Sequence, residues 1–323
     1  MQIKLSNPRG FCAGVHMAID IIDMLLDAID DDENLYVYHE IVHNHHVVER
    51  LRERGAVFVD TIDEIPEGSI VVFSAHGVSP KVREEADNRN LNCIDATCPL
   101  VTKVHAEAIR YEKRGWQIIL IGHRNHQEVV GTQGEAPQAI QVIESPSDIS
   151  SLHIVDPDKL VYLTQTTLSI EDAEIIISEL KKSFPTIHAP PSDDICYATT
   201  NRQTVVREDA ASADVVLVVG SKNSSNSLRL TEIARAAGTP AYLIDDVTHL
   251  QESWLVGVET VLITAGASAP EHLVLEIVDH LVEHHSGELE DETTFDEGMS
   301  FSMPRSLTSF LHARDITVEG HSK

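Results

Sequence analysis

Three of the four cysteines recur at a long and nearly regular spacing. Cys12, Cys98 and Cys196 are separated by 86 and 98 residues, and each precedes a segment with the apolar period of a helix. Cys93 lies instead in LNCIDA, which reads as a strand, and it does not share the pattern. Three thiolates on three separate loops could hold a metal ion or an iron–sulfur cluster and leave one coordination position open, because soft thiolates favour zinc and iron–sulfur centres.

The chemistry of these thiols leaves three interpretations open. Structural zinc sites usually carry local CxxC pairs and four closed ligands, whereas the repeated cysteines are far apart in the sequence. Three thiolates suit a [4Fe–4S] cluster with one iron free to bind a substrate. Zinc and unligated buried thiols are the other two interpretations.

Polar loops follow each cysteine at similar distances, each at the end of a predicted strand. About thirty residues after the three cysteines come His43, His126 and Asn226, the last preceded by Ser224 and Ser225. A second series follows 64, 68 and 72 residues after them and consists of His76, Thr166 and Ser268. Most of these side chains are neutral hydrogen-bond donors. With Gly77 and Gly266 allowing close backbone approach, they predict a pocket for a phosphate or diphosphate.

Glu128 is the only carboxylate at these loop positions, where it stands beside His126 in GHRNHQE. A carboxylic acid at a strand end in a desolvated cavity has a raised pKa and can donate a proton. The segment TQTTLS supplies the hydroxyl groups of Thr164, Thr166 and Thr167, which could relay or position that proton. Alone, Glu128 would suit an exposed surface position; its place in the repeat favours a catalytic acid.

The elements that must position these residues alternate between strands and helices. Short Val- and Ile-rich runs predict parallel strands that are buried on both faces, at 70–73, 117–121, 215–219 and 260–263. Amphipathic stretches predict helices at 15–28, 103–114, 170–183, 228–237 and 272–283. Any large α/β protein shows such alternation, but the equivalent cysteines favour three repeated units. Open α/β units bind ligands at the carboxyl ends of their strands, so three units around an axis would share one cavity.

Composition narrows the class of protein. The chain has 323 residues, of which 42% are hydrophobic and 24% charged, so it can bury an ordinary globular core. A net charge of −28 argues against general binding to nucleic acid or to an anionic membrane, and local donors must then hold any anionic ligand. The sequence has no run of 18 apolar residues, no secretory signal and no GxxxxGK[ST] or GxGxxG motif. We therefore expect a cytoplasmic protein with reduced thiols and no ATP or dinucleotide site.

Long contiguous motifs resemble the LytB/IspH family of 4-hydroxy-3-methylbut-2-enyl diphosphate reductases. They are NPRGFCAGV, SAHGVS, DATCPLVTKVH, TQTTLS, DDICYATTNRQ, VGSKNSSNS and TAGASAP. The resemblance runs from Met1 to about residue 284, and the motif residues show no departure from it. The chain differs only outside the motifs, such as at the His-rich stretch 44–46 and in its acidic tail.

This resemblance implies a fold and an activity. Three α/β units would form a trefoil around a [4Fe–4S] cluster held by Cys12, Cys98 and Cys196, a cluster that can degrade to [3Fe–4S] or be lost from a preparation. The substrate diphosphate would be held by residues matching His43, His76, His126, Ser224, Ser225, Asn226 and Ser268. The hydroxyl group would approach the open iron near Thr166, with Glu128 as the proton donor. Two electrons from a ferredoxin or flavodoxin would give isopentenyl and dimethylallyl diphosphate, ending the methylerythritol phosphate pathway.

Other functions make different demands on the same residues. A hydro-lyase uses a similar cluster without external electrons, so dependence on an electron donor separates it from a reductase. An iron or redox sensor would not need a carboxylic acid and a diphosphate pocket facing the open iron. A structural zinc protein would be colourless.

The repeat divides the chain into predicted units. The first spans 14–97, the second 98–195 and the third 196–284, with the N-terminal segment 1–13 assigned to the third. An acidic tail follows at 285–323, exposed over SGELEDETTFDEG. The stretch FSMPRSLTSFLHARDI after it is expected to return and pack on the body.

Overall fold

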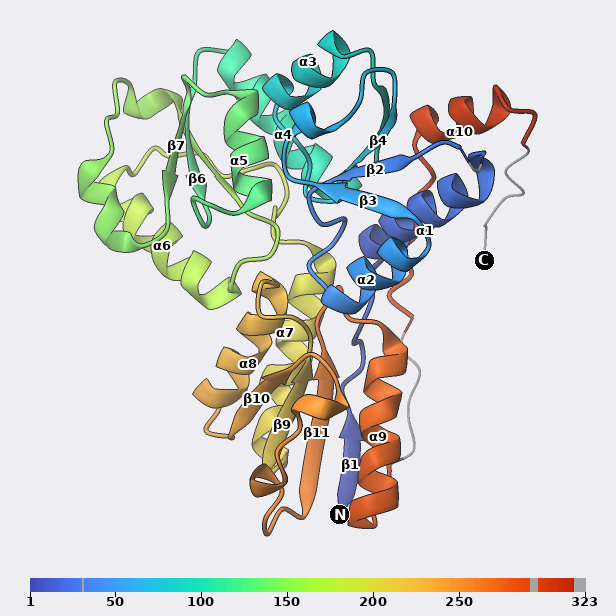
Figure 1. The fold of residues 1–323 in the computed structure, drawn as a ribbon. Helices are drawn as coiled ribbons and strands as arrows, with labels where there is room; N and C mark the ends of the chain where they lie inside the picture. The colour runs from blue at the N-terminus through green and yellow to red at the C-terminus, as the bar shows by residue number, and fades with distance from the viewer. Residues whose placement is uncertain (31, 291–295, 317–323) are drawn as a thin grey trace.

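The computed structural model describes residues 1–30, 32–290 and 296–316, and they form three lobes around a common centre (Figure 1). Each lobe contains one sheet of parallel strands covered by helices. This is the trefoil of three α/β units that the sequence predicted. Where strand and helix alternate, the carboxyl ends of the parallel strands become the natural place for a ligand.

The first lobe contains a sheet with the strand order β3-β2-β4-β5. Its strands are β2 (Leu35–Tyr38), β3 (Ala56–Val59), β4 (Ile70–Phe73) and β5 (Asn92–Asp95). Its helices are α1 (Ala13–Ala28), α2 (His45–Glu53) and α3 (Pro80–Asn88). All four residues of β4 are buried, because this central strand is covered on both faces.

The second lobe contains a sheet with the order β7-β6-β8. Its strands are β6 (Gln117–Ile121), β7 (Ile140–Ile143) and β8 (Leu160–Thr164). Its helices are α4 (Pro99–Lys113), α5 (Gln127–Glu135) and α6 (Ile170–Ser183). The central strand β6 packs one face on the core under α4 and the other on the core under α6.

The third lobe contains a sheet with the order β10-β9-β11-β1-β12. Its strands are β1 (Gln2–Leu5), β9 (Val215–Val219), β10 (Ala241–Ile244), β11 (Thr260–Ala265) and β12 (Glu288–Leu289). Its helices are α7 (Tyr197–Asp209), α8 (Ser225–Ala236) and α9 (Glu271–His285). The strand β1 pairs with β11, Ile3 opposite Val261. The chain therefore starts in this lobe and crosses to the first through the segment that carries Cys12.

Short 3₁₀ helices lie in the connections. They are η1 (Ile62–Glu64), η2 (Pro146–Ser151), η3 (Pro157–Lys159), η4 (Ala210–Ser212), η5 (Val247–His249) and η6 (Glu252–Trp254). Among the described residues, no helix combines the length and the apolar character needed to cross a membrane.

The predicted elements agree with the structure at strand centres and differ at helix starts. Strands β4, β6 and β9 and helix α6 have the predicted bounds. Helix α4 begins at Pro99 rather than 103, and α8 begins at Ser225 rather than 228. The first turn of α8 is polar and lacks an apolar period, whereas α4 starts at the proline next to Cys98, in a segment that is predicted to be a loop. The division into units 14–97, 98–195 and 196–284 stays a prediction.

The tail returns to the first lobe as expected. Helix α10 (Arg305–His312) packs near α1 and β5, with Leu307 and Leu311 buried in that lobe's core (Figure 1). The predicted acidic tail at 285–323 includes 291–295 and 317–323, which lie outside the described residues.

Candidate functional site

Each of the three repeated cysteines caps the start of a helix. Cys12 is the N-cap residue of α1, Cys98 of α4 and Cys196 of α7. A helix N-terminus presents unpaired backbone N–H groups and the positive end of the helix dipole, and both stabilise a thiolate. The loop-before-helix position predicted for these cysteines is therefore confirmed. This shared position explains the regular spacing of the cysteines in the sequence, because each lobe supplies one thiol at the start of an equivalent helix.

The three thiols lie close enough to influence one another. Burial, together with the neighbouring Cys12, raises the pKa of Cys98 to about 12 and that of Cys196 to about 11. A Cβ atom on Gly14 would lie 2.7 Å from the Cys98 sulfur and 3.9 Å from the Cys12 sulfur, so only glycine fits between them. All four cysteines are free thiols. Three buried thiols can ionise together only beside a cation, which makes this group a fitting metal-centre ligand set.

Three histidines form one wall of the site. His43, His76 and His126 follow β2, β4 and β6, and their ring centroids lie 4.1 to 5.8 Å apart. Burial, together with the neighbouring His43, lowers the pKa of His126 to about 3 and that of His76 well below its ordinary value. These two rings are therefore neutral at pH 7. His126 accepts the Glu128 N–H at Nδ1, so its proton lies on Nε2 as a free donor.

His43 differs from its two neighbours through a carboxylate. Glu40 lies 3.2 Å from His43 Nδ1, and this hydrogen bond lowers the pKa of Glu40. Asn223 donates to the same Glu40 oxygen at 2.7 Å. Glu40 thus joins the loop of the first lobe that carries His43 to Asn223 of the third lobe. Glu40 stands in the segment HEIVHN, so Glu128 is not the only carboxylate on these loops. The position of Glu40 three residues before His43 was the sequence feature that could have identified it.

The third lobe contributes a wall of small polar side chains. Ser224 caps α8 by accepting the Ser227 N–H at 3.3 Å, and Ser268 donates to the His43 carbonyl at 2.9 Å, which joins the first and third lobes. Asn226 is 4% exposed, and neither polar atom of its side chain has a hydrogen-bond partner among the described residues. Buried amides are normally paired, so Asn226 is arranged for a ligand.

Glu128 lies at the start of α5 and is only 3% exposed. When ionised, it accepts the Thr166 backbone N–H at Oε1 (2.6 Å) and the Thr166 hydroxyl at Oε2 (2.9 Å). Burial raises its pKa to about 7, against the lowering effect of those two hydrogen bonds. A backbone N–H can only donate, so Oε1 must remain an acceptor and the acidic proton belongs on Oε2, beside a hydroxyl that can accept it.

One cavity brings together the three repeated cysteines, Glu128, Thr166 and all of the predicted diphosphate ligands. Its lining includes Cys12, Cys98, Cys196, His43, His76, His126, Glu128, Thr166, Ser224, Ser225, Asn226 and Ser268. Thr167 also lines it, whereas Thr164 does not; the backbone N–H of Thr164 is bound by Asp194 instead. Sequence reasoning missed Thr199, whose hydroxyl lies 3.2 Å from the Cys196 sulfur. The position of Thr199 three residues after Cys196, in the first turn of α7, was the sequence feature that could have identified it.

Packing, rather than ligand approach, explains the two glycines singled out in the sequence. Gly77 has a φ of +78°, and a Cβ there would lie 3.0 Å from the His105 ring. A Cβ on Gly266 would lie 2.0 Å from the Ser227 hydroxyl. Neither glycine lines the cavity.

A buried cation ties two of the cysteine segments to the tail. Arg202, in α7, has no exposed surface and donates to the Gly10 carbonyl at 2.8 and 3.1 Å, two residues before Cys12. Its other side faces Glu297, with both carboxylate oxygens at 3.1 Å. The described part of the tail therefore supplies the counter-charge behind the thiol group.

Replacing Glu297 with alanine is expected to lower the free energy of unfolding by about 3–5 kcal/mol, because Arg202 would become an uncompensated buried charge. Anaerobic denaturation followed by circular dichroism measures the change. Glu290→Ala is the matched control, since its partner Lys4 lies 3.9 Å away at the surface and such pairs contribute about 0–1 kcal/mol. Equal stabilities of the two variants would contradict this role of Glu297.

Comparisons with known proteins agree with this geometry. Residues 3–282 match the family described as LytB protein. The 4-hydroxy-3-methylbut-2-enyl diphosphate reductase of Rhodopirellula baltica is 52% identical over 310 residues, which is 96% of this chain and 97% of that relative. The reductase of Hahella chejuensis is 53% identical over 311 residues, which is 95% of this chain and 98% of that relative.

Two solved structures share the fold. One is the E-1-hydroxy-2-methyl-but-2-enyl-4-diphosphate reductase from Plasmodium falciparum, with a TM-score of 0.92, 38% identity and coverage of 97% of this chain and 99% of that one. The other is (E)-4-hydroxy-3-methyl-but-2-enyl diphosphate reductase, described as the terminal enzyme of the non-mevalonate pathway. It has a TM-score of 0.63 and 30% identity, and the match covers 88% of this chain and 100% of that one.

Proposed function

We propose, since the chain belongs to the LytB protein family, that it reduces 4-hydroxy-3-methylbut-2-enyl diphosphate. Two electrons and two protons remove the hydroxyl group as water and leave isopentenyl and dimethylallyl diphosphate. The observation that carries this proposal is the single cavity in which three buried thiols, a carboxyl group with a pKa of about 7 and a wall of hydrogen-bond donors meet.

The thiols of Cys12, Cys98 and Cys196 would hold a [4Fe–4S] cluster. Support comes from their three helix N-termini, which favour thiolates, and from their raised pKa values, which a cationic centre would reverse. When bound, the cluster supplies electrons and a Lewis acid for the hydroxyl group. A ferredoxin or flavodoxin is the proposed electron donor.

The diphosphate would lie between the histidine wall and the third lobe. Its ligands would be His43, His76, His126, Ser224, Ser225, Asn226 and Ser268. The chain carries a net charge of −28, so binding depends on these local donors rather than on long-range attraction. Neutral His126 donates from Nε2, and Glu40 holds the His43 ring at Nδ1.

Proton delivery falls to Glu128 and Thr166. The Thr166 hydroxyl lines the cavity and would give its own proton to the leaving hydroxyl group, while it takes the proton from Glu128 Oε2, which lies 2.9 Å away. A hydroxide leaving group needs this proton, because it is otherwise a poor leaving group. The second proton is added to carbon and completes isopentenyl or dimethylallyl diphosphate.

An anaerobic turnover assay tests the proposal. Purified brown protein is mixed with the substrate and reduced methyl viologen, and the C5 diphosphates and the oxidised dye are both counted. We expect two electrons per product molecule. Conversion of the substrate without electron consumption would identify a hydro-lyase instead, and a colourless protein after reconstitution with iron and sulfide would overturn the proposal.

Asn226→Ala is expected to raise KM by about 10- to 100-fold, since a hydrogen bond to a charged group contributes about 1.5–3 kcal/mol. Its stability should be retained or increased, because an unpaired buried amide is removed. Steady-state kinetics and thermal unfolding measure the two effects. The exposed Asn88→Ala is the control, with KM unchanged; a loss of stability in Asn226→Ala would instead assign this side chain a structural role.

A further inference from the structure

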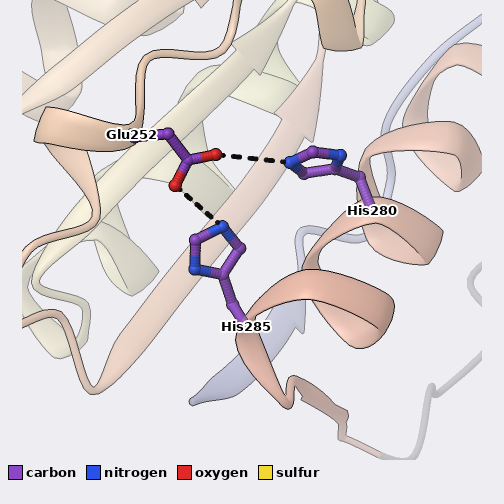
Figure 2. A group of neighbouring side chains, drawn as sticks. All are labelled: Glu252, His280 and His285. Atoms are coloured by element: carbon purple, nitrogen blue, oxygen red, sulfur yellow. Dashed lines mark ion pairs between the residues drawn. The ribbon is translucent and has the colours of Figure 1, made fainter.

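A second group of metal-binding side chains lies outside the thiol cavity. Glu252 comes from η6, and His280 and His285 come from the second half of α9 (Figure 2). Their ligand atoms lie within 4.8 Å of one another. One carboxylate oxygen is 3.7 Å from His280 Nε2, and the other is 3.2 Å from His285 Nε2. Figure 2 shows both rings turned toward the same carboxylate.

This group lies at the far end of the third lobe from the cavity. Helix α9 begins three residues after Ser268, which lines the cavity, and its 15 residues extend about 22 Å away from it. The turn with Glu252 precedes β11, so it lies at the amino ends of the parallel strands. In Figure 1 this is the end of the lobe where the chain starts.

The contacts are poorly suited to an ordinary hydrogen-bonded ion pair. His285 Nε2 is buried and has no hydrogen-bond partner among the described residues, although a Glu252 oxygen lies only 3.2 Å away. The distance is short but the alignment needed for a hydrogen bond is missing. Two imidazole nitrogens and a carboxylate that converge without aligned hydrogen bonds are arranged for a shared ion.

The ligand types and separations fit a zinc ion. Zinc binds imidazole nitrogen and carboxylate oxygen at about 2.0–2.2 Å, so tetrahedral ligand atoms lie roughly 3.3–3.6 Å apart. The separations of 3.2 and 3.7 Å are close to that range. Calcium and magnesium prefer all-oxygen sites, which this group does not offer.

We propose that Glu252, His280 and His285 bind a zinc ion, with water in the fourth position. The ion joins the turn before β11 to the last turns of α9. The chain just beyond α9 is already held there, because the Gly287 N–H binds the Leu281 carbonyl and the Glu288 N–H binds the Met1 carbonyl. Zinc therefore stabilises this end of the third lobe, from which the tail departs.

Zinc binding to the protein with its cluster in place tests the proposal. A chromophoric chelator competes for zinc, and we expect one tightly bound zinc ion per chain. Alanine at His280 or His285, or glutamine at Glu252, should weaken zinc binding by more than the roughly 10- to 100-fold that loss of an outer-shell partner costs. His272→Ala, in the first turn of the same helix, is the matched control and should bind zinc normally.

The thiols are the competing zinc ligands, and cobalt separates the two sites. Cobalt difference spectra should show d–d bands without sulfur-to-cobalt charge transfer, and the three variants should lose these bands. Zinc should raise the melting temperature of the parent protein and of His272→Ala, but not of the ligand variants. Sulfur-to-cobalt charge transfer, equal zinc affinity in all variants, or no zinc binding would each overturn the proposal.

Discussion

Glutamine in place of Glu128 is expected to lower kcat by about 10²- to 10⁴-fold, the usual contribution of a general acid. KM should change little, because an amide can still accept the Thr166 N–H at the position of Oε1. The measurement is steady-state turnover under anaerobic conditions at saturating substrate, with cluster content checked by absorption. Glutamine keeps the shape of the Glu128 side chain and removes only its titratable proton, so a lower kcat would reflect the loss of proton transfer.

A buried carboxyl group elsewhere in the same lobe provides the control. Glu107 is 7% exposed in α4, and burial also raises its pKa, but it does not line the cavity. Glu107→Gln should therefore keep the parent kcat. Equal rates for Glu128→Gln and the parent protein would remove Glu128 from the mechanism.

The same substitution should change the pH dependence of rate and stability. In the parent protein, kcat should fall as pH rises through about 7, because the proton on Glu128 is lost there. The folded pKa lies above the ordinary value of 4.5, so protonated Glu128 stabilises the fold fully below pH 4.5 and this contribution is lost as pH rises through about 7. Relative to the parent, Glu128→Gln should gain stability between pH 5 and pH 8.5. Unfolding at these two pH values measures the gain.

Serine in place of Cys98 is expected to prevent assembly of the proposed iron–sulfur cluster and to abolish turnover. A hydroxyl group is a poor substitute for thiolate at an iron–sulfur centre, and the two remaining thiols cannot close the site. Iron analysis, the visible absorption of the anaerobic protein and the turnover assay measure the loss. We expect activity below a thousandth of the parent value, because chemistry and electron transfer fail together.

Cys93 offers a control five residues away. It lies in β5 with its sulfur 3.6 Å from the Leu91 carbonyl, outside the cavity. Cys93→Ser should retain iron, colour and activity. If Cys98→Ser kept its iron while Cys93→Ser lost it, the cluster ligands would have to be reassigned.

The repeated pattern of cysteines and polar loops in the sequence predicted most of the residues that line the cavity. Parallel strands end at one edge, so residues after β2, β4 and β6, such as His43, His76 and His126, must approach the same centre when three lobes meet. Continuous Val and Ile runs also marked β4, β6 and β9, because a strand covered on both faces needs apolar residues at every position. The fold class and the meeting of the three thiols and Glu128 in one cavity therefore followed from residue type and order.

Only the tertiary structure decided the contacts between distant residues and the environment of each titratable group. Arg202 meets Glu297 and the Gly10 carbonyl, Glu252 meets two histidines of α9, and Asn226 is left without a partner. None of these has a periodic signal, because each depends on how surfaces far apart in the sequence pack. Periodicity reports which face of an element is buried. The pKa of Glu128 depends on how completely water is excluded and which donors face it, and packing alone determines both.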